Sequence, residues 1–282
     1  MTVSRATILA MSLAFPPIAG VDFTSAPSRR KPIVAALGRR EGKVIALEGF
    51  ELHTSFPMFS AWLRTPGPWL GAFDLPFGLP RELVLTLGWP TEWRALMRHY
   101  AALSRAEIRA TFAAFCAARP VGGKFAHRAT DGPSGSSPSM KWVNPPVAFM
   151  LHAGVPLLLD AGLHLPGLHG GDPLRVALEG YPGMLARELV GARSYKSDTS
   201  SKQTPQRTAA RRDLVAALEA GHSRLGLELS LTRVQRIALL DDAMGDRLDS
   251  VLCLMQAGWA AGQPNHGLPP DMDPLEGWTV TS

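Results

Sequence analysis

Short apolar runs bounded by turn residues predict the strands of this chain. Runs of four to eight apolar residues lying between Gly, Pro and polar positions are typical of buried strands. Two of the runs flank the sequence GRREG, so we expect these two strands to pair as an antiparallel hairpin. The five predicted strands cover residues 18–23, 33–37, 44–47, 69–73 and 174–178.

Apolar residues at helical spacing predict helices between and after these strands. Ser104 and Glu107 have the S-x-x-E spacing of a capping box, which predicts that a helix begins there. Pro156 lacks the backbone N–H group that a helix interior uses, so it predicts an interruption. The predicted helices lie within 55–65, 81–119 and 147–162, directly behind the strand at 174–178, and over 232–262.

The order of these elements predicts an α/β protein with a mixed sheet. We expect the first three strands to be antiparallel and the later strands to be joined through helices. Residues 120–146 are rich in Gly, Ser and Pro, which predicts a long exposed loop. No internal repeat is visible, and 282 residues suit one large domain.

Composition narrows the class of protein. The chain is 46% hydrophobic and 19% charged, which fits a globular protein with a substantial core. A net charge of +5 permits a polyanionic partner without requiring one. The two cysteines, Cys116 and Cys253, are far apart, which excludes a disulfide framework and a cysteine-based zinc site. The motifs G-x-x-x-x-G-K and G-x-S-x-G do not occur, which argues against P-loop and α/β-hydrolase enzymes.

The N-terminus has some features of a targeting segment. The first 17 residues contain one Arg and a short apolar run, and small residues follow, as in a weak signal peptide. Cleavage near Ala19 would remove part of the first predicted strand, so we expect the segment to be kept and the protein to be cytoplasmic. No apolar run reaches the ~20 residues that a membrane-spanning helix needs, so we expect no membrane partner.

Acidic residues stand at or next to the ends of three of the predicted strands. Asp22, Asp74 and Glu179 each stand at a strand end, and sites in open α/β sheets form at the carboxyl ends of strands. Within 232–262, three more acids are spaced i, i+4 and i+7, which predicts that they share one helix face. These three are Asp242, Asp246 and Asp249.

A cluster of carboxylates predicts a divalent cation, because the ion relieves their mutual repulsion. Oxygen-only ligands favour Mg²⁺ or Mn²⁺ over zinc, and two such ions about 4 Å apart promote phosphodiester cleavage. Each acid also has a simpler interpretation. Asp22 and Asp74 are both suited to cap turns, and Glu179 is suited to pair with an arginine such as Arg187. The acids of 232–262 are also what a solvated helix face contains.

Four segments together resemble a predicted RNase H-like nuclease family. They are GVDFTSAP, FDLPFGLP, EGYP and DDAMGDRLDSVLCLMQAGWA, and the resemblance spans residues 18–261. It implies one RNase H-like domain over 1–282, with a five-stranded mixed sheet and a helical insertion, 81–150, after the fourth strand. Where the family has D-A in the final helix, this chain has Asp249 followed by Ser250.

The resemblance also implies roles for individual residues. The catalytic acids would be Asp22, Asp74, Glu179 and Asp249. The same four would bind the metal together with Asp246, which precedes Asp249 as in the D-x-x-D of Holliday-junction resolvases.

Basic residues near these acids predict contacts with phosphate groups. Those expected to bind nucleic acid are Lys196, Lys202, Arg207 and Arg211 after the E-G-Y-P segment, and Lys124 and Arg128 in the predicted loop. A solvated helix face and an exposed loop explain the same residues without any ligand.

The sequence therefore predicts a Mg²⁺- or Mn²⁺-dependent phosphodiester hydrolase, a nuclease that acts on DNA or RNA. Two alternatives stay open. One is a nucleic-acid- or protein-binding module that keeps the fold without catalysis. The other is a phosphotransferase of the sugar-kinase and actin type, which normally needs two such domains and glycine-rich phosphate loops.

Overall fold

A seven-stranded mixed sheet forms the centre of the computed structural model, which describes residues 15–282. The strand order is β5-β6-β4-β1-β2-β3-β7. Only β2 runs antiparallel to the other strands. The strands are β1 (Ile18–Asp22), β2 (Ile33–Glu41), β3 (Val44–His53), β4 (Trp69–Asp74), β5 (Leu163–His164), β6 (Asp172–Glu179) and β7 (Glu228–Ser230).

The predicted α/β class with a mixed sheet is confirmed, and the five predicted strands are all present. The sheet also contains β5 and β7, which the sequence did not predict because two or three residues are too short for any periodicity to show. The hairpin strands are longer than predicted: β2 continues through most of GRREG to Glu41, β3 continues to His53, and the turn between them uses Gly42 in a left-handed conformation, with φ of 62°.

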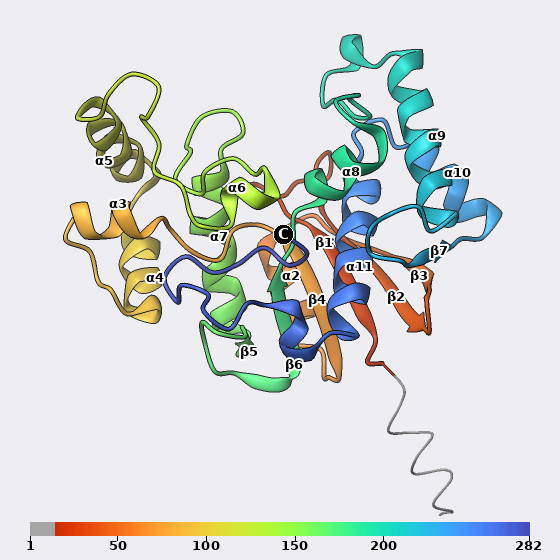
Figure 1. Cartoon of the computed structure of the whole chain (residues 1–282), viewed down its shortest axis with the longest axis horizontal. Coiled ribbons are helices and arrows are strands. Elements are labelled where there is room, and N and C mark those ends of the chain that lie inside the picture. The colour runs from red at the N-terminus through yellow and green to blue at the C-terminus, as the bar shows by residue number, and fades with distance from the viewer. Residues whose placement is uncertain (1–14) are drawn as a thin grey trace, which may run out of the picture.

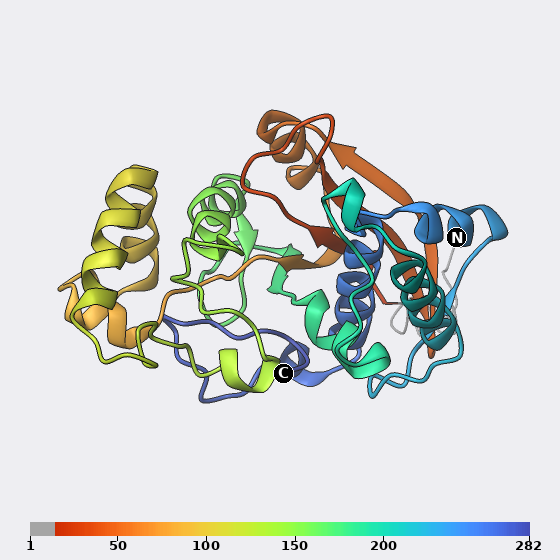
Figure 2. The same cartoon turned by 90° about the horizontal axis from the view of Figure 1, so that it is seen from above.

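Helices cover both faces of the sheet, as Figures 1 and 2 show. On one face lie α2 (Phe56–Leu63) and α7 (Val147–Asp160), with the helices of the 81–119 segment beyond them. The opposite face is covered by α8 (Pro182–Val190), α9 (Pro205–Glu219), α10 (Arg233–Asp241) and α11 (Asp246–Ala261). Each face therefore has its own hydrophobic core, and the two cores are separated by the sheet.

The helical part of 81–119 consists of three helices, α3 (Arg81–Thr86), α4 (Trp93–Ala102) and α5 (Arg105–Ala117). The capping box predicted at Ser104 and Glu107 is confirmed: each side chain accepts a hydrogen bond from the other residue's backbone N–H group. The interruption predicted at Pro156 is wrong, because α7 continues through this residue. One missing backbone hydrogen bond does not end a helix whose side chains are packed in the core on both sides of the proline.

The helix predicted over 232–262 is two helices, α10 and α11, separated at residues 242–245. Gly245 has a φ of 81°, a left-handed conformation that glycine adopts without strain and that a continuous helix cannot contain. The break lets α11 run in its own direction across β1, β2 and β4 (Figure 1).

A glycine in β1 brings α11 unusually close to the sheet. A Cβ atom at Gly20 would lie 2.6 Å from the Cα of Leu254, and still closer to the backbone nitrogen of Leu254 and the carbonyl oxygen of Ser250. Only a residue without a side chain allows two backbones to approach in this way. The contact places the first turn of α11 beside the carboxyl end of β1.

The exposed loop predicted for 120–146 is exposed only in part. It contains the short helix α6 (Asp131–Ser134), and Arg128, Thr130 and Asp131 are buried. The C-terminal segment packs against it, since the carboxylate of Glu276 accepts a hydrogen bond from the Ala129 nitrogen at 2.7 Å. The chain therefore ends beside the carboxyl edge of the central strands, as Figure 1 shows.

The leader hypothesis concerns residues 1–17, and all but the last three of these lie outside the described residues. In the part of the chain from residue 15 onward, no helix has the length and apolarity that a membrane crossing requires.

Candidate functional site

Asp22 and Asp74 lie side by side at the carboxyl edge of the sheet. They are the last residues of β1 and β4, which are parallel neighbours, and the two residues are partners in the register. Residues paired in this way point to the same face of a sheet. Asp22 is only 8% exposed. The two acids that the sequence places at strand ends are thus adjacent carboxylates in the structure.

The first turn of α11 adds two more carboxylates, Asp246 and Asp249, to this edge. Asp249 is fully buried, and Asp246 is nearly so. Asp242 does not share their face, contrary to the sequence prediction, because the helix is broken before Asp246. Its carboxylate instead accepts hydrogen bonds from the backbone nitrogens of Gly245 at 3.2 Å and Arg247 at 2.8 Å, so it supports the beginning of α11.

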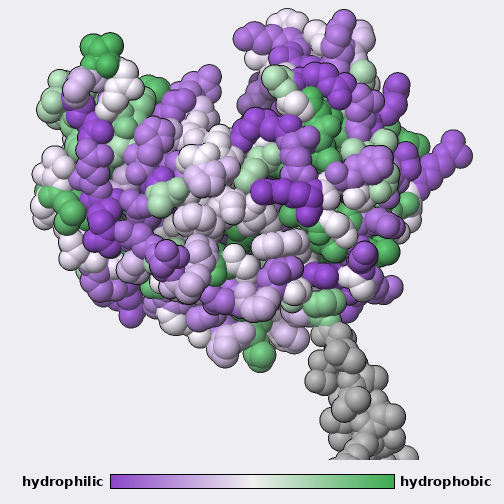
Figure 3. All heavy atoms as spheres, viewed as in Figure 1, coloured by the Kyte–Doolittle hydropathy of each residue, from purple (hydrophilic) through white to green (hydrophobic). Residues whose placement is uncertain are grey.

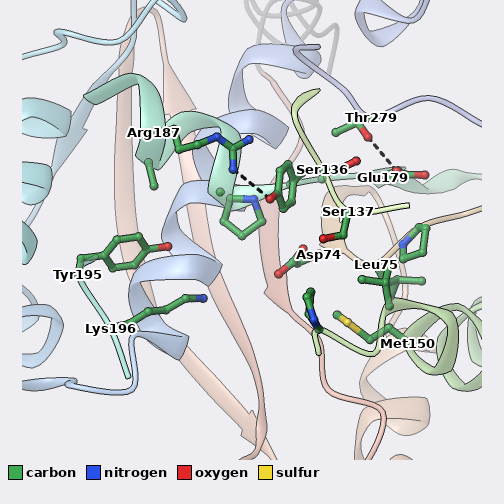
Figure 4. A pocket seen from close by; sticks show the side chains of 18 of the residues that line it. Asp74, Leu75, Ser136, Ser137, Met150, Glu179, Arg187, Tyr195, Lys196 and Thr279 are labelled. Carbon is green, nitrogen blue, oxygen red and sulfur yellow. Dashed lines mark hydrogen bonds between the residues drawn. The ribbon is translucent and has the colours of Figure 1, made fainter. Parts of the chain in front are cut away.

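The carboxylates differ in how they are neutralised. Asp249 accepts hydrogen bonds from the Tyr195 hydroxyl and from the Lys196 ammonium group, which forms an ion pair with it. Within residues 15–282 no protein group donates a hydrogen bond to the carboxylates of Asp22, Asp74 or Asp246 (Figure 4 shows Asp74 and Lys196). Asp22 and Asp74 therefore cap no turn, and the simpler interpretation of these two acids is wrong. Nearly buried carboxylates without a donor are costly, and a cation would remove that cost.

Burial and mutual repulsion shift the pKa values of this cluster upward. Burial raises the pKa of Asp22 well above its usual value, and repulsion from Asp249 adds to the shift. The same two causes raise the pKa of Asp74 to about 7. Burial is also the main reason why the pKa of Asp246 rises to about 6, although Lys31 opposes this shift. The site thus holds negative charge poorly without a cation.

These shifts predict that the metal-free protein loses stability as pH rises from 6.5 to 8.0. An unfolded Asp loses its proton near pH 4, whereas folded Asp74 keeps it to about pH 7 and Asp22 is shifted in the same direction. The folded state therefore binds more protons in this range, and the free energy of unfolding falls with pH. The stabilisation is fully present below pH 4 and is lost as pH rises through the folded pKa values.

Chemical denaturation in EDTA at several pH values measures this effect. Burial lowers the pKa of His53, His169 and His266, and this acts in the opposite direction, because unfolded histidines bind protons up to about pH 7.5. The histidines are the same in a variant of Asp74, so comparison with that variant removes their contribution. An Asp74→Asn variant should show a flatter dependence than the wild type. An equal slope in the two proteins would contradict the assignment of the pH dependence to this cluster.

Glu179 ends β6 beside Asp74, but its carboxylate is fully engaged elsewhere. Arg128 donates two hydrogen bonds to it, at 2.7 and 2.8 Å, and the backbone nitrogen of Phe77 and the hydroxyl of Thr279 each donate one at 2.8 Å. Four donors leave no free oxygen lone pair for a metal. The prediction that Glu179 is a metal ligand together with Asp22 and Asp74 is therefore wrong. It does pair with an arginine, but with Arg128 and not with the expected Arg187.

Two of the residues expected to bind nucleic acid are internal. Arg128 is 3% exposed and pairs with Glu179 and Asp131. Arg211 is 4% exposed and donates to the carbonyl oxygens of Leu240 and Tyr195 at 2.9 and 2.8 Å. Neither can reach a phosphate at the surface, so these two predictions are wrong. Arg211 instead holds the segment that carries Tyr195 in place.

The other four basic residues have accessible side chains. Lys196 is turned toward Asp249 and therefore belongs to the acidic cluster, although its side chain is 42% exposed. Lys124 and Lys202 are exposed, and Arg207 is partly so. The role of these residues in binding nucleic acid remains a prediction.

Sequence reasoning missed Tyr195. It directly precedes Lys196, is nearly buried, and donates its hydroxyl to Asp249. The only sequence feature that could have indicated Tyr195 is its position next to Lys196, a predicted site residue.

Lys31, in the turn after β1, donates to both carboxylate oxygens of Asp198 at 2.9 Å, which ties that turn to the segment that carries Tyr195.

A cavity of about 420 Å³ opens beside Asp74. It lies between the loop that follows α6 and the beginning of α8, and Lys196 and Tyr195 stand at one end of it (Figure 4). In the space-filling view a deep notch separates the lobe that contains α5 from the lobe that contains α9 (Figure 3). Asp74 is thus reachable from solvent through this cavity.

The residues present suit an oxygen-ligated cation, but they do not form a finished cage. No three acidic, histidine or cysteine side chains in the described part of the chain are already arranged around one point for a metal. Asp249 is held by Lys196 and Tyr195, whereas Asp22 and Asp74 have free oxygens. Such hard donors fit Mg²⁺ or Mn²⁺, and both ions commonly keep several water ligands beside one or two carboxylates.

Comparison of the chain with family models, curated proteins and solved structures found no match.

Proposed function

We propose that this protein is a metal-dependent phosphodiester hydrolase that acts on nucleic acid. The observation that carries the proposal is the pair Asp22 and Asp74, adjacent on parallel strands, nearly buried or half-buried, and without any donor from residues 15–282. Together with Asp246 and Asp249 from α11, they concentrate negative charge at an accessible edge of the sheet. A divalent cation and a substrate phosphate are the groups that this edge best accommodates.

The strand order supports an RNase H-like core. The five predicted strands are neighbours in the order β3-β2-β1-β4-β6, with β2 antiparallel to the others. This order and direction agree with what the family resemblance implies, and α11 crosses the central strands to bring its acids to the end of β1. On this proposal β5 and β7 are additions at the two edges.

Asp22 and Asp74 would hold the Mg²⁺ or Mn²⁺ ion, with Asp246 as a further ligand. When bound, the ion would supply charge stabilisation and an activated water. Lys196 neutralises Asp249 and places a fixed positive charge within the same cluster. Tyr195 orients that carboxylate through its hydroxyl. The protein's own part is therefore to keep the carboxylates of Asp22, Asp74 and Asp246 free and to hold that of Asp249 with a lysine.

Exposed basic residues around this edge would contact neighbouring phosphates. Arg29 and Arg30 lie in the turn after β1, next to Lys31. Lys202 and Arg207 follow Lys196 in the segment that Lys31 contacts through Asp198. Contacts of this kind bind nucleic acid without regard to sequence and weaken as salt increases.

A crystal soaked in millimolar Mn²⁺ tests the metal site directly. We expect an anomalous density peak in contact with the carboxylates of Asp22 and Asp74, and no peak in an Asp74→Asn crystal treated in the same way. Carboxylates that still lack a metal at millimolar Mn²⁺ would overturn the proposal. That outcome would favour a binding module without catalysis, in which Lys196 alone balances the charge of Asp249.

A further inference from the structure

The cavity beside Asp74 extends well beyond the carboxylates and has walls of a different character. Its volume of about 420 Å³ falls in the range of about 300–1,000 Å³ that is usual for small-molecule pockets. One wall is apolar and is formed by Leu75, Val147 and Met150. The metal-binding proposal does not account for this wall, because a hydrated cation and a phosphate need only polar groups.

An aromatic ring also lines the cavity. Tyr181 lies at the beginning of α8, and the guanidinium of Arg187 stands 5.3 Å from the centre of its ring and donates a hydrogen bond to its hydroxyl at 3.1 Å. Gly183 gives the ring its room, since a Cβ at this position would lie 2.8 Å from a ring carbon. The ring is therefore held in a fixed orientation at the cavity wall.

Polar groups also line the cavity, but those of Arg128, Glu179 and Thr279 are hydrogen-bonded to one another. Ser136 and Ser137 lie on the loop after α6, and Figure 4 shows Ser137 close to Asp74. The hydroxyl of Ser136 donates to Asp131 at 3.1 Å, whereas that of Ser137 forms no hydrogen bond with any described residue. Arg193 and Lys196 also line the cavity, each paired with a carboxylate, Arg193 with Asp213 at 2.6 Å and Lys196 with Asp249.

We propose that this cavity binds a single unstacked nucleobase, next to the phosphodiester that the carboxylates act on. A cavity lined by apolar side chains and an aromatic ring suits a flat heterocycle, and a free hydroxyl suits the polar edge of the base. Arg193 and Lys196, whose charges their carboxylate partners balance only locally, would lie near the attached phosphate. This inference rests on the proposed function and narrows its substrate class.

A base that packs on the Tyr181 ring cannot at the same time be stacked within a duplex. Bases within a duplex have both faces covered, and an enzyme reaches one of them only by taking it out of the stack. A cavity of about 420 Å³ has room for one nucleoside. The substrate is thus single-stranded nucleic acid, an unpaired strand end, or a base extruded from a duplex.

Calorimetric titration of the full chain with AMP and with ribose 5-phosphate, in EDTA, tests this site without metal or cleavage. We expect AMP to bind at least about 10-fold more tightly than ribose 5-phosphate, because only AMP carries a base that can stack. Tyr181→Ala should weaken AMP binding by about 10- to 100-fold, whereas Tyr181→Phe, which keeps the ring, should stay within about 3-fold of the wild type. Equal binding of the two ligands by the wild type would overturn the inference without the need for any variant.

Cleavage assays separate this inference from the proposed function. Base-dependent AMP binding without metal-dependent cleavage of any nucleic acid would support the nucleobase site and overturn the hydrolase proposal. Metal-dependent cleavage of duplex and single strand at equal rates, unaffected by Tyr181→Ala, would support the hydrolase proposal and overturn the nucleobase site. A preference for single strands that Tyr181→Ala removes supports both.

Discussion

An Asp22→Asn variant is expected to lose metal-dependent cleavage by more than about 100-fold without destabilising the metal-free protein at pH 8. Outer-shell partners of metal sites typically contribute 10- to 100-fold, so a direct ligand should contribute more. Stability should not fall, because the carboxylate of Asp22 receives no hydrogen bond from residues 15–282 and its burial as an anion is unfavourable. Loss of cleavage with retained stability would show that the carboxylate of Asp22 serves metal binding and not folding.

Three measurements check this prediction: initial cleavage rates on a labelled single strand in Mg²⁺, the free energy of unfolding in EDTA, and the shift of the thermal midpoint on adding Mg²⁺. The midpoint should rise for the wild type and much less for the variant, because a ligand stabilises only a protein that binds it. Asp160→Asn is the matched control, since Asp160 is an exposed carboxylate at the end of α7, far along the chain from every site residue. A loss of more than about 1 kcal/mol in Asp22→Asn would instead give Asp22 a structural role.

The position of Asp22 and Asp74 could be predicted from the sequence because it depends on local rules. Apolar runs located the two strands; Asp22 stands one residue before the end of its run, and Asp74 follows its run directly. Parallel pairing of neighbouring strands then brings their carboxyl ends to one edge of the sheet. Glu179 obeys the same rule and also reaches this edge. Its partner Arg128 could not be predicted, because 51 residues separate the two and only the packed structure brings them together.

Charge in the sequence does not reveal burial. Arg128 and Arg211 stand in polar, glycine- or serine-rich surroundings, which favoured an exposed position for both. Each is buried because carboxylates or carbonyl oxygens match its planar donors, and a paired arginine is one of the few charged groups that an interior accepts.

The helix break before Asp246 had a signal in the sequence, namely Gly245. An isolated glycine within a helical pattern also occurs in unbroken helices, so the residue alone did not decide between one helix and two. The left-handed conformation of Gly245 and the capping contacts of Asp242 belong to the same turn. One change in local geometry therefore removed Asp242 from the predicted cluster and kept Asp246 and Asp249 in it.

A Gly20→Ala variant is expected to destabilise the protein by about 3 kcal/mol or more, the upper end of the usual cost of overpacking. The added methyl group would overlap with the backbone of α11 at Ser250 and Leu254, and backbone atoms cannot move aside as a flexible side chain does. Relief requires α11 to shift away from β1. Because Asp249 lies one residue before Ser250, the shift also separates it from Asp22.

Gly49→Ala is the matched control for this variant. Gly49 lies in β3 of the same sheet, and nothing stands within 4 Å of the position that its Cβ would take. Alanine there should leave stability unchanged or raise it by up to about 1 kcal/mol, since it reduces the freedom of the unfolded chain. Urea denaturation of both variants measures the difference. If Gly20→Ala were as stable as Gly49→Ala, the close approach of α11 to β1 would not be what fixes the acids of the helix beside Asp22. If Gly20→Ala is less stable and also binds Mn²⁺ more weakly, then the close packing of α11 on Gly20 is what holds the acids of this helix in position at the metal site.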